Sequence, residues 1–238
     1  MRFWIVCIII FSSAPGYAQW ELSAGAGYGT FAMKDLHKFQ ELILTQSIVK
    51  PEVTDAFPGQ VIYQASTIYT FRRGLFLGLS YQFGSTGGRV TYSDYSGSFY
   101  ADQLLRYTQL SINLGESMQV GRNLSLRVDV QPGATFSKLH YKSLIKIGEA
   151  KVEESAKFHS INWIAEPTFT LLKQWGNWGA RLSVGYHTDG YSGKLKVKGG
   201  DAWLTNGYDP VHADWNGLRT TLGVAVKLSR PDRSKQAL

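Results

Sequence analysis

The stretch that decides the fold runs from Leu218 to Leu228 and reads L-R-T-T-L-G-V-A-V-K-L. Apolar residues such as Leu222 alternate with polar or small residues such as Arg219 and Lys227. Strict alternation is typical of a β-strand with one apolar face and one polar face. The stretch is about 11 residues long, which is the length that a tilted strand needs to cross a bilayer.

The same alternation recurs along the chain and predicts an all-β fold. The predicted strands are 20–29, 60–72, 75–84, 104–118, 124–136, 159–172, 180–189 and 218–228. Pro132 lies inside the fifth of them, where its missing N–H predicts a bulge or local fraying. Short turns near 72–74, 121–123 and 174–177 alternate with long connections at 31–59, 86–103, 138–158 and 191–214. This asymmetry is typical of an eight-stranded antiparallel up-and-down transmembrane β-barrel, in which the short turns are periplasmic.

Composition agrees with one all-β domain. The chain has 238 residues with 25 Gly and 13% aromatic residues. No segment after the first 20 residues holds 18 consecutive apolar residues, which excludes a helical membrane protein. We expect the barrel to span residues 19–230, with a polar periplasmic tail at 231–238.

The first 18 residues have the pattern of a cleaved secretion signal. Arg2 precedes the apolar run Phe3 to Phe11, and Gly16-Tyr17-Ala18 is a small-x-small cleavage site before Gln19. The single cysteine, Cys7, lies inside this signal peptide, 1–18. We therefore expect a mature chain without a disulfide, a thiol nucleophile or a thiolate metal site.

The net charge does not indicate nucleic-acid binding. The formal charge is +7, or about +6 without Arg2, and the cations are spread over polar strand faces and long connections. They form no basic motif interleaved with aromatic residues, so we expect no nucleic-acid partner.

The first long connection contains a predicted amphipathic helix at 33–44. Leu36, Phe39, Leu42 and Ile43 fall on one face at helical spacing. Such a helix could cap the mouth of the barrel, bind a partner or fold back on the rim, and we expect the last of these.

Aromatic residues are sorted by height along the predicted strands. With the first strand running outward, one group falls near the outer rim: Tyr28, Tyr63, Tyr81, Phe83, Phe136, Trp163, Tyr186 and Trp215. A second group falls near the inner rim: Trp20, Phe71, Trp175 and Trp178. Two aromatic girdles are typical of a barrel in a bilayer, because amphipathic rings prefer the interface. A soluble lipocalin-type barrel would instead turn its apolar face inward.

The run Gly27-Tyr28-Gly29-Thr30-Phe31 is followed by Met33-Lys34-Asp35-Leu36. With the strand pattern, the chain resembles the small eight-stranded outer-membrane β-barrel proteins of Gram-negative bacteria over its whole mature length, and this run is similar to the first strand and loop of barrels from Bacteroidota. The resemblance implies assembly by the barrel assembly machinery. One departure concerns the assembly signal: such barrels often end at an aromatic residue, whereas this strand ends at Leu228 and a polar basic tail follows.

The polar strand faces would line an interior that is just wide enough for side chains to fill. The inward set comprises Glu21, Arg72, Arg127, Asp129, Glu166, Arg181, His187, Asp189, Arg219 and Lys227. Buried charges of both signs must be paired and hydrogen-bonded. We expect a salt-bridged, filled interior, and the alternative is a narrow polar pore for small solutes.

Catalytic and metal-binding motifs are weak. His187, Asp189 and Ser183 resemble parts of a hydrolytic triad, but their parity points them into the lumen. His159 and Ser160 lie at a rim without an evident acid. The five histidines are scattered without metal-ligand spacing, so no metal, cofactor or catalytic residue is predicted.

The predicted function is non-enzymatic: envelope structure, or surface interaction through four long outer connections. The alternatives are a narrow small-solute channel and a lipid-modifying outer-membrane enzyme. We expect a monomer surrounded by outer-membrane lipid. Lysines of the outer connections are also candidates for contact with lipopolysaccharide phosphates: Lys138, Lys142, Lys146, Lys194, Lys196 and Lys198.

Overall fold

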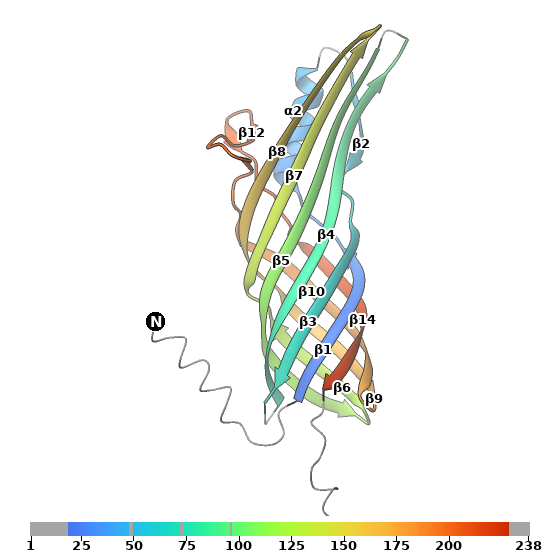
Figure 1. Cartoon of the computed structure of the whole chain (residues 1–238), viewed down its shortest axis with the longest axis vertical. Coiled ribbons are helices and arrows are strands. Elements are labelled where there is room, and N and C mark those ends of the chain that lie inside the picture. Colours follow the sequence, from blue (N-terminus) through green and yellow to red (C-terminus); the bar gives the residue numbers. More distant parts are fainter. Residues whose placement is uncertain (1–18, 48–49, 72–73, 96, 229–238) are drawn as a thin grey trace, which may run out of the picture.

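The computed structural model describes residues 19–47, 50–71, 74–95 and 97–228 (Figure 1). Three predictions fall outside these residues: the signal peptide at 1–18, the polar tail at 231–238 and the lumen position of Arg72. Among the described residues, no helix is both long enough and apolar enough to cross a membrane.

Eight wall strands form a ring of antiparallel pairs, each joined to its neighbours in the sequence. β14 pairs with β1 from Leu228 opposite Trp20 to Arg219 opposite Gly29, which closes the ring. All the predicted strands are present, and the all-β antiparallel prediction is confirmed. In chain order the wall is β1 (Gln19–Gly29), β3 (Gln60–Thr70), β4 (Leu75–Ser93), β5 (Gly97–Gly121), β6 and β7 (Leu124–Val130 and Gly133–Ile147), β8 and β9 (Ala150–Ala165 and Pro167–Trp175), β10 (Trp178–Tyr191) and β14 (Gly217–Leu228).

Two adjacent wall strands are interrupted at the same height. β6 ends before Gln131-Pro132, and β8 ends before Glu166-Pro167. The backbone groups of Gln131 and Glu166 bond to each other across the two breaks, with N···O distances of 2.9 and 3.2 Å. The interruption predicted at Pro132 is confirmed, since proline has no N–H to give to the ladder.

Above the ring, β4, β5, β7 and β8 continue as a curved sheet (Figure 1). β2 (Glu52–Ala56) adds to its β4 edge, and β11 (Lys196–Val197) adds to its β8 edge. The hairpin predicted within 138–158 is confirmed, with its turn at Gly148 (φ 58°). The loop predicted at 86–103 is wrong, because most of this segment continues the two strands. β12 (Thr205–Asn206) and β13 (Asp209–Pro210) form a small separate hairpin.

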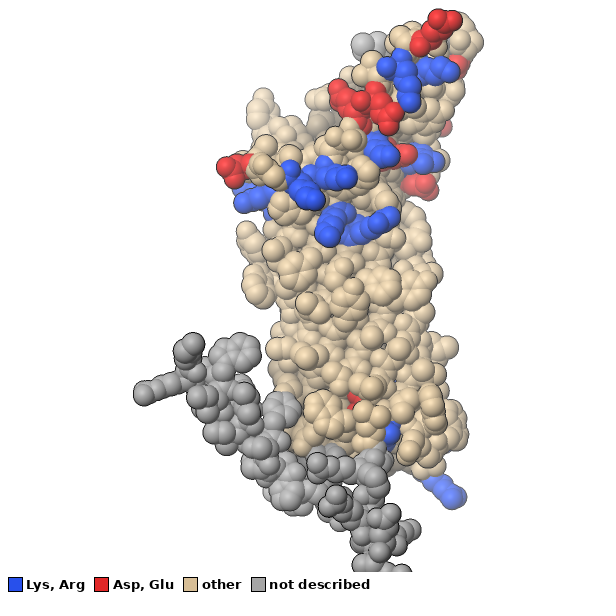
Figure 2. Space-filling model, in the orientation of Figure 1, with Lys and Arg blue, Asp and Glu red and all other residues tan. Residues whose placement is uncertain are grey.

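The two faces of the ring have opposite polarity. Apolar side chains such as Trp163 (63% exposed) and Leu222 (65% exposed) point outward, whereas the alternate residues are buried in the interior. Figure 2 shows the result as a broad uncharged belt, with most Lys, Arg, Asp and Glu residues gathered above it on the face seen.

The helix predicted at 33–44 is confirmed as α2 (Lys34–Gln46). Met33 and Leu36 are fully buried with inward-facing wall residues such as Ile62 and Leu105. The start of the helix therefore covers the mouth of the ring, which corrects the expectation that the helix folds back on the rim.

The rest of α2 lies against the raised sheet. Gln40 is buried and donates from Nε2 to the carbonyl oxygen of Asp55, 3.0 Å away. The Phe39 ring packs edge-on against Tyr141, with 6.0 Å between ring centroids. Burial at this contact raises the pKa of Tyr141 above its ordinary value.

Candidate functional site

The interior of the ring is filled by two layers of side chains, and the lower layer is polar. Near the short-turn end, Arg127 donates from both terminal nitrogens to the carboxylate of Glu21, at 2.6 and 2.7 Å. Both side chains are buried, and the guanidinium lies over the Phe76 ring, 5.7 Å from its centroid. A bidentate geometry is the strongest form of this ion pair and suits a buried site.

Arg181 occupies the next position, and among the described residues no carboxylate binds it in a bidentate way. It donates from Nη1 to the hydroxyls of Ser23 and Ser66, at 2.8 and 2.9 Å, and from Nε to that of Ser183, at 2.8 Å. Asp129 nearby accepts hydrogen bonds from the amide of Gln131, at 2.9 Å, and from that of Asn113. Neutral hydroxyls and amides thus disperse charge that the salt bridges do not neutralise.

Glu166 is the centre of a third polar group in the lower layer, after the Arg127–Glu21 pair and the group around Arg181. Its Oε2 accepts from Arg219 Nη1 at 3.1 Å and lies 3.2 Å from His187 Nδ1. His187 Nε2 lies 3.3 Å from Asp189, so the imidazole bridges two carboxylates. Arg219 also donates to the side-chain oxygens of Gln82 and Gln109. Glu166 lies at the break between β8 and β9, and from there its carboxylate accepts a hydrogen bond from the Arg219 guanidinium.

The upper layer is an apolar cluster that the sequence does not predict as a unit. Loop residues pack there against inward-facing wall residues, and the members are Phe31, Met33, Leu36, Phe57, Ile62, Leu105, Tyr107, Leu139, Phe158, Leu195, Val211, Ala213 and Trp215. Arg219 lies under the Tyr107 ring, 5.2 Å from its centroid, and so connects the two layers.

The predicted place of Trp215 in the outer girdle is wrong, because this residue is buried in the interior. It is 0% exposed, its ring lies 4.4 Å from that of Tyr107 and 5.0 Å from that of Phe31, and its Nε1 donates to Ser137 Oγ at 2.8 Å. The residue precedes β14, so strand parity does not apply to it. Nine other residues predicted for the girdles are exposed on the outer face: Trp20, Tyr28, Tyr63, Phe71, Tyr81, Phe136, Trp163, Trp178 and Tyr186.

The structure brings together eight predicted lumen residues with buried side chains: Glu21, Arg127, Asp129, Glu166, Arg181, His187, Asp189 and Arg219. Lys227 lies opposite Glu21 on the same inward face, where it is partly buried and donates to Gln174 at 2.7 Å. Sequence reasoning missed the amides of Gln82 and Gln109 as charge partners. It also missed the apolar layer. The available signal was that a few strand positions expected to face inward carry apolar residues, such as Ile62, Leu139 and Phe158.

The geometry does not assemble a catalytic triad. Ser183 bonds Arg181 and Thr170, and among the described residues it makes no hydrogen bond to His187. His159 is exposed on the outer face, whereas Ser160 is buried on the inner face. No cluster of three or more His, Cys, Asp or Glu residues that could hold a metal occurs within the described part of the chain.

These features define a class of protein: a ring of strands with an apolar outer surface and a packed polar interior. A scan against protein-family models gives no match, and no curated protein matches the chain. Among solved structures, the outer membrane protein OprG from Pseudomonas aeruginosa is similar with a TM-score of 0.51 and 10% identity, covering 90% of this chain and 97% of OprG. The chain therefore shares the fold of an outer-membrane β-barrel.

Two further solved structures have lower similarity. The attachment invasion locus protein Ail of Yersinia pestis is 14% identical with a TM-score of 0.38, over 90% of this chain and 100% of Ail. Neisserial surface protein A is 10% identical with a TM-score of 0.41, over 90% of this chain and 100% of that protein.

Proposed function

We propose that this protein is an eight-stranded up-and-down transmembrane β-barrel of a Gram-negative outer membrane. The outward apolar belt and the buried polar interior support this, since a soluble barrel has the reverse polarity. In water the belt would be an exposed apolar surface much larger than soluble monomers carry. In a bilayer the same surface would contact apolar lipid chains and not water.

The surroundings of the barrel follow from this proposal. We expect a monomer bounded by outer-membrane lipid, secreted by a cleaved signal peptide and inserted by the barrel assembly machinery. Its short turns face the periplasm, and the raised sheet with α2 faces outward. The narrower resemblance to barrels from Bacteroidota stays a prediction.

The proposed role is non-enzymatic: envelope structure, or surface interaction through the raised outer connections. The observation that carries this proposal is that two layers of side chains, one polar and one apolar, fill the interior of the ring. Three arginines occupy the lower layer, and Trp215, Phe31 and Tyr107 pack across the upper layer. An eight-stranded ring has little room beyond such side chains.

Location is tested by separating inner and outer membranes and by running the extracted protein on a gel, boiled and unboiled. We expect the protein in the outer-membrane fraction with a mobility shift on boiling, because a closed barrel resists detergent until heated. A soluble periplasmic protein without a shift would contradict the membrane proposal.

The closed interior is tested by conductance in a planar bilayer. We expect no steps from the purified protein, while a porin added to the same bilayer serves as the positive control. Reproducible steps from the unmodified protein would contradict the closed interior and favour the alternative of a narrow solute channel.

Enzyme activity is tested by incubating the folded protein with phospholipid and with lipid A. We expect no turnover, because Ser183 and His187 are buried in the interior and do not bond each other. Turnover that disappears in a His187→Ala variant would favour the lipid-modifying enzyme instead.

A further inference from the structure

A row of basic side chains crosses four neighbouring strands on the outer surface, just above the apolar belt. Arg106 of β5 lies opposite Lys138 of β7, Lys138 lies opposite His159 of β8, and His159 lies opposite Lys196 of β11. Directly opposed residues share a face with Cβ atoms about 5 Å apart, and like charges so placed destabilise a sheet. A free-standing sheet has no reason to keep this arrangement.

A second group of cations lies beside this row. Lys157 lies opposite His140, and the backbone N–H of Lys198 bonds the carbonyl oxygen of Lys157 at 2.8 Å. Within the described part of the chain, no ion pair or side-chain hydrogen bond is found for the following cations: Arg106, Lys138, Lys157, Lys196 and Lys198.

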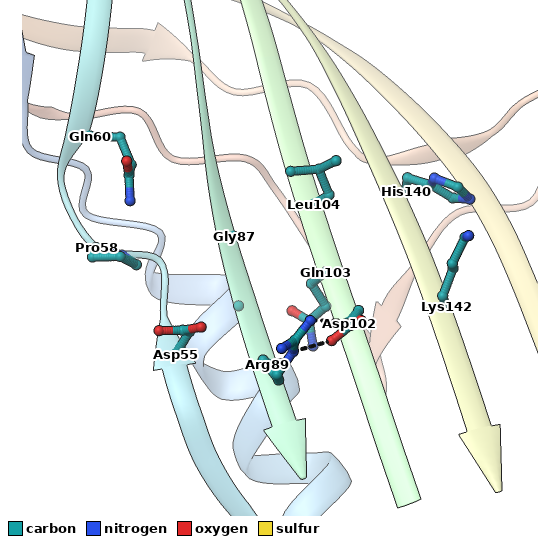
Figure 3. Close-up of a pocket in the computed structure, with 11 residues that line it drawn as sticks. Asp55, Pro58, Gln60, Gly87, Arg89, Asp102, Gln103, Leu104, His140 and Lys142 are labelled. Atoms are coloured by element: carbon teal, nitrogen blue, oxygen red, sulfur yellow. Dashed lines mark hydrogen bonds and ion pairs between the residues drawn. The ribbon is translucent and has the colours of Figure 1, made fainter.

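In a neighbouring hollow on the same outer surface, a cation is neutralised by a carboxylate of the protein itself. There Arg89 forms an ion pair with Asp102 at 2.5 Å, in a hollow that Asp55 and Lys142 also line (Figure 3). Asp102 raises the pKa of Arg89 by hydrogen bonding and charge attraction. The Lys138 row has no such carboxylate beside it in the described structure.

Four of these cations, Arg106, Lys138, Lys157 and Lys198, line a hollow of about 670 Å³ that has no acidic residue in its lining. Its lower wall is apolar and includes Phe136 and Ile161, which belong to the exposed belt, whereas Leu104 lies higher, opposite His140. Phe136 is two residues below Lys138 on β7, which corresponds to about 7 Å along a strand. The hollow therefore has an apolar lower part and a cationic upper part within the length of one lipid headgroup.

We propose that this hollow binds the phosphate groups of a phosphorylated, acylated lipid of the outer leaflet. Lys138, Lys157 and Lys198 contact the phosphates, and the acyl chains lie along Phe136 and Ile161. The site rests on the proposed function, because only insertion at the height of the belt brings the hollow level with lipid headgroups. A bound phosphate would also relieve the repulsion between the opposed cations.

The test compares retention of lipid A carrying both phosphates with retention of the same lipid after dephosphorylation, each presented to the full-length protein in neutral detergent micelles. We expect preferential retention of the phosphorylated lipid, decreasing with added salt because exposed charges are screened. A Lys138→Gln/Lys157→Gln variant should bind it about 30-fold more weakly, since each cation near such a surface contributes about fivefold.

The matched control is Lys34→Gln/Lys38→Gln, which removes two exposed cations from α2, away from the hollow. This control should bind as the unmodified protein does. Equal retention of both lipids, or an equal loss of lipid binding in both variants, would overturn the lipid site. The barrel proposal would then still stand if the protein keeps its boiling-dependent gel shift. A protein absent from the outer membrane would overturn both.

Discussion

Arg127 and Glu21 are 106 positions apart in the sequence, and their buried ion pair connects opposite parts of the wall. Removing one member leaves an uncompensated buried charge, whereas replacing both with apolar residues removes the desolvation cost as well. We expect Arg127→Met to lower the free energy of unfolding by about 3–5 kcal/mol and Glu21→Leu/Arg127→Met to restore most of it. Urea unfolding in detergent micelles, followed by tryptophan fluorescence, measures both. A double variant less stable than the single variant would contradict this account.

Gln103 is a buried polar residue that, unlike Arg127 and Glu21, has no bonded side-chain partner among the described residues. It is buried, and neither its amide nitrogen nor its amide oxygen has a hydrogen-bond partner in the described structure. Gln103→Met keeps the volume and removes two unsatisfied groups, so we expect a gain of about 1 kcal/mol in the same unfolding measurement. The control is Gln82→Met, which should destabilise the protein because Gln82 accepts from Tyr107 and Arg219.

Strand parity predicts which charged residues face inward, but it does not predict their partners. Glu166 bonds Arg219 from a strand break, and Gln109 completes the contact from across the ring. Such pairs depend on the curvature and register of the closed ring, which one strand does not encode. Trp215 was misplaced because it lies in a loop, where alternation gives no direction.

Among the elements, α2 was predictable because its apolar residues have helical spacing. The continuation of β4 and β5 through 86–103 was not, because Gly and Ser are poor strand formers and the local sequence indicates a loop. Pairing overrides this preference, since each strand supplies the other with ladder hydrogen bonds. Strand boundaries here are set by the neighbouring strand.

The connection that bears α2 is a separable element of the structure. Leu36 is its most deeply buried helical residue, and it packs into the apolar layer of the interior. We expect Leu36→Ala to release the helix locally while the ring stays folded, since large-to-small changes at buried sites cost about 2–5 kcal/mol. Limited proteolysis of the folded protein should then cut within 34–46 while the boiling-dependent gel shift persists. Lys38→Ala, on the exposed face, is the control and should stay resistant; equal cleavage of both variants would contradict the packing role of Leu36.

At the scale of the whole molecule, the alternation of short turns with long connections predicted the order of strands in the ring. The apolar layer was not predictable in the same way, because its residues come from connections far apart in the sequence, such as Phe31, Phe57 and Val211. They meet only after the ring has brought the ends of its strands together. The filled interior is thus a consequence of closure.

Closure depends on β1 meeting β14, and glycines face each other at this seam. Gly25 lies opposite Gly223, and a Cβ on Gly27 would overlap the carbonyl oxygen of Thr220 and lie 2.6 Å from the Cα of Thr221. Both obstacles are backbone atoms, which move only if the two strands separate. We expect Gly27→Ala to impair closure, which lowers the fraction of protein with folded gel mobility and its midpoint in urea. Gly200→Ala is the matched control, because a Cβ there has no atom within 4 Å. If the two variants fold equally well, the close approach of β1 and β14 does not limit closure, and the ring must tolerate a wider seam than its register implies.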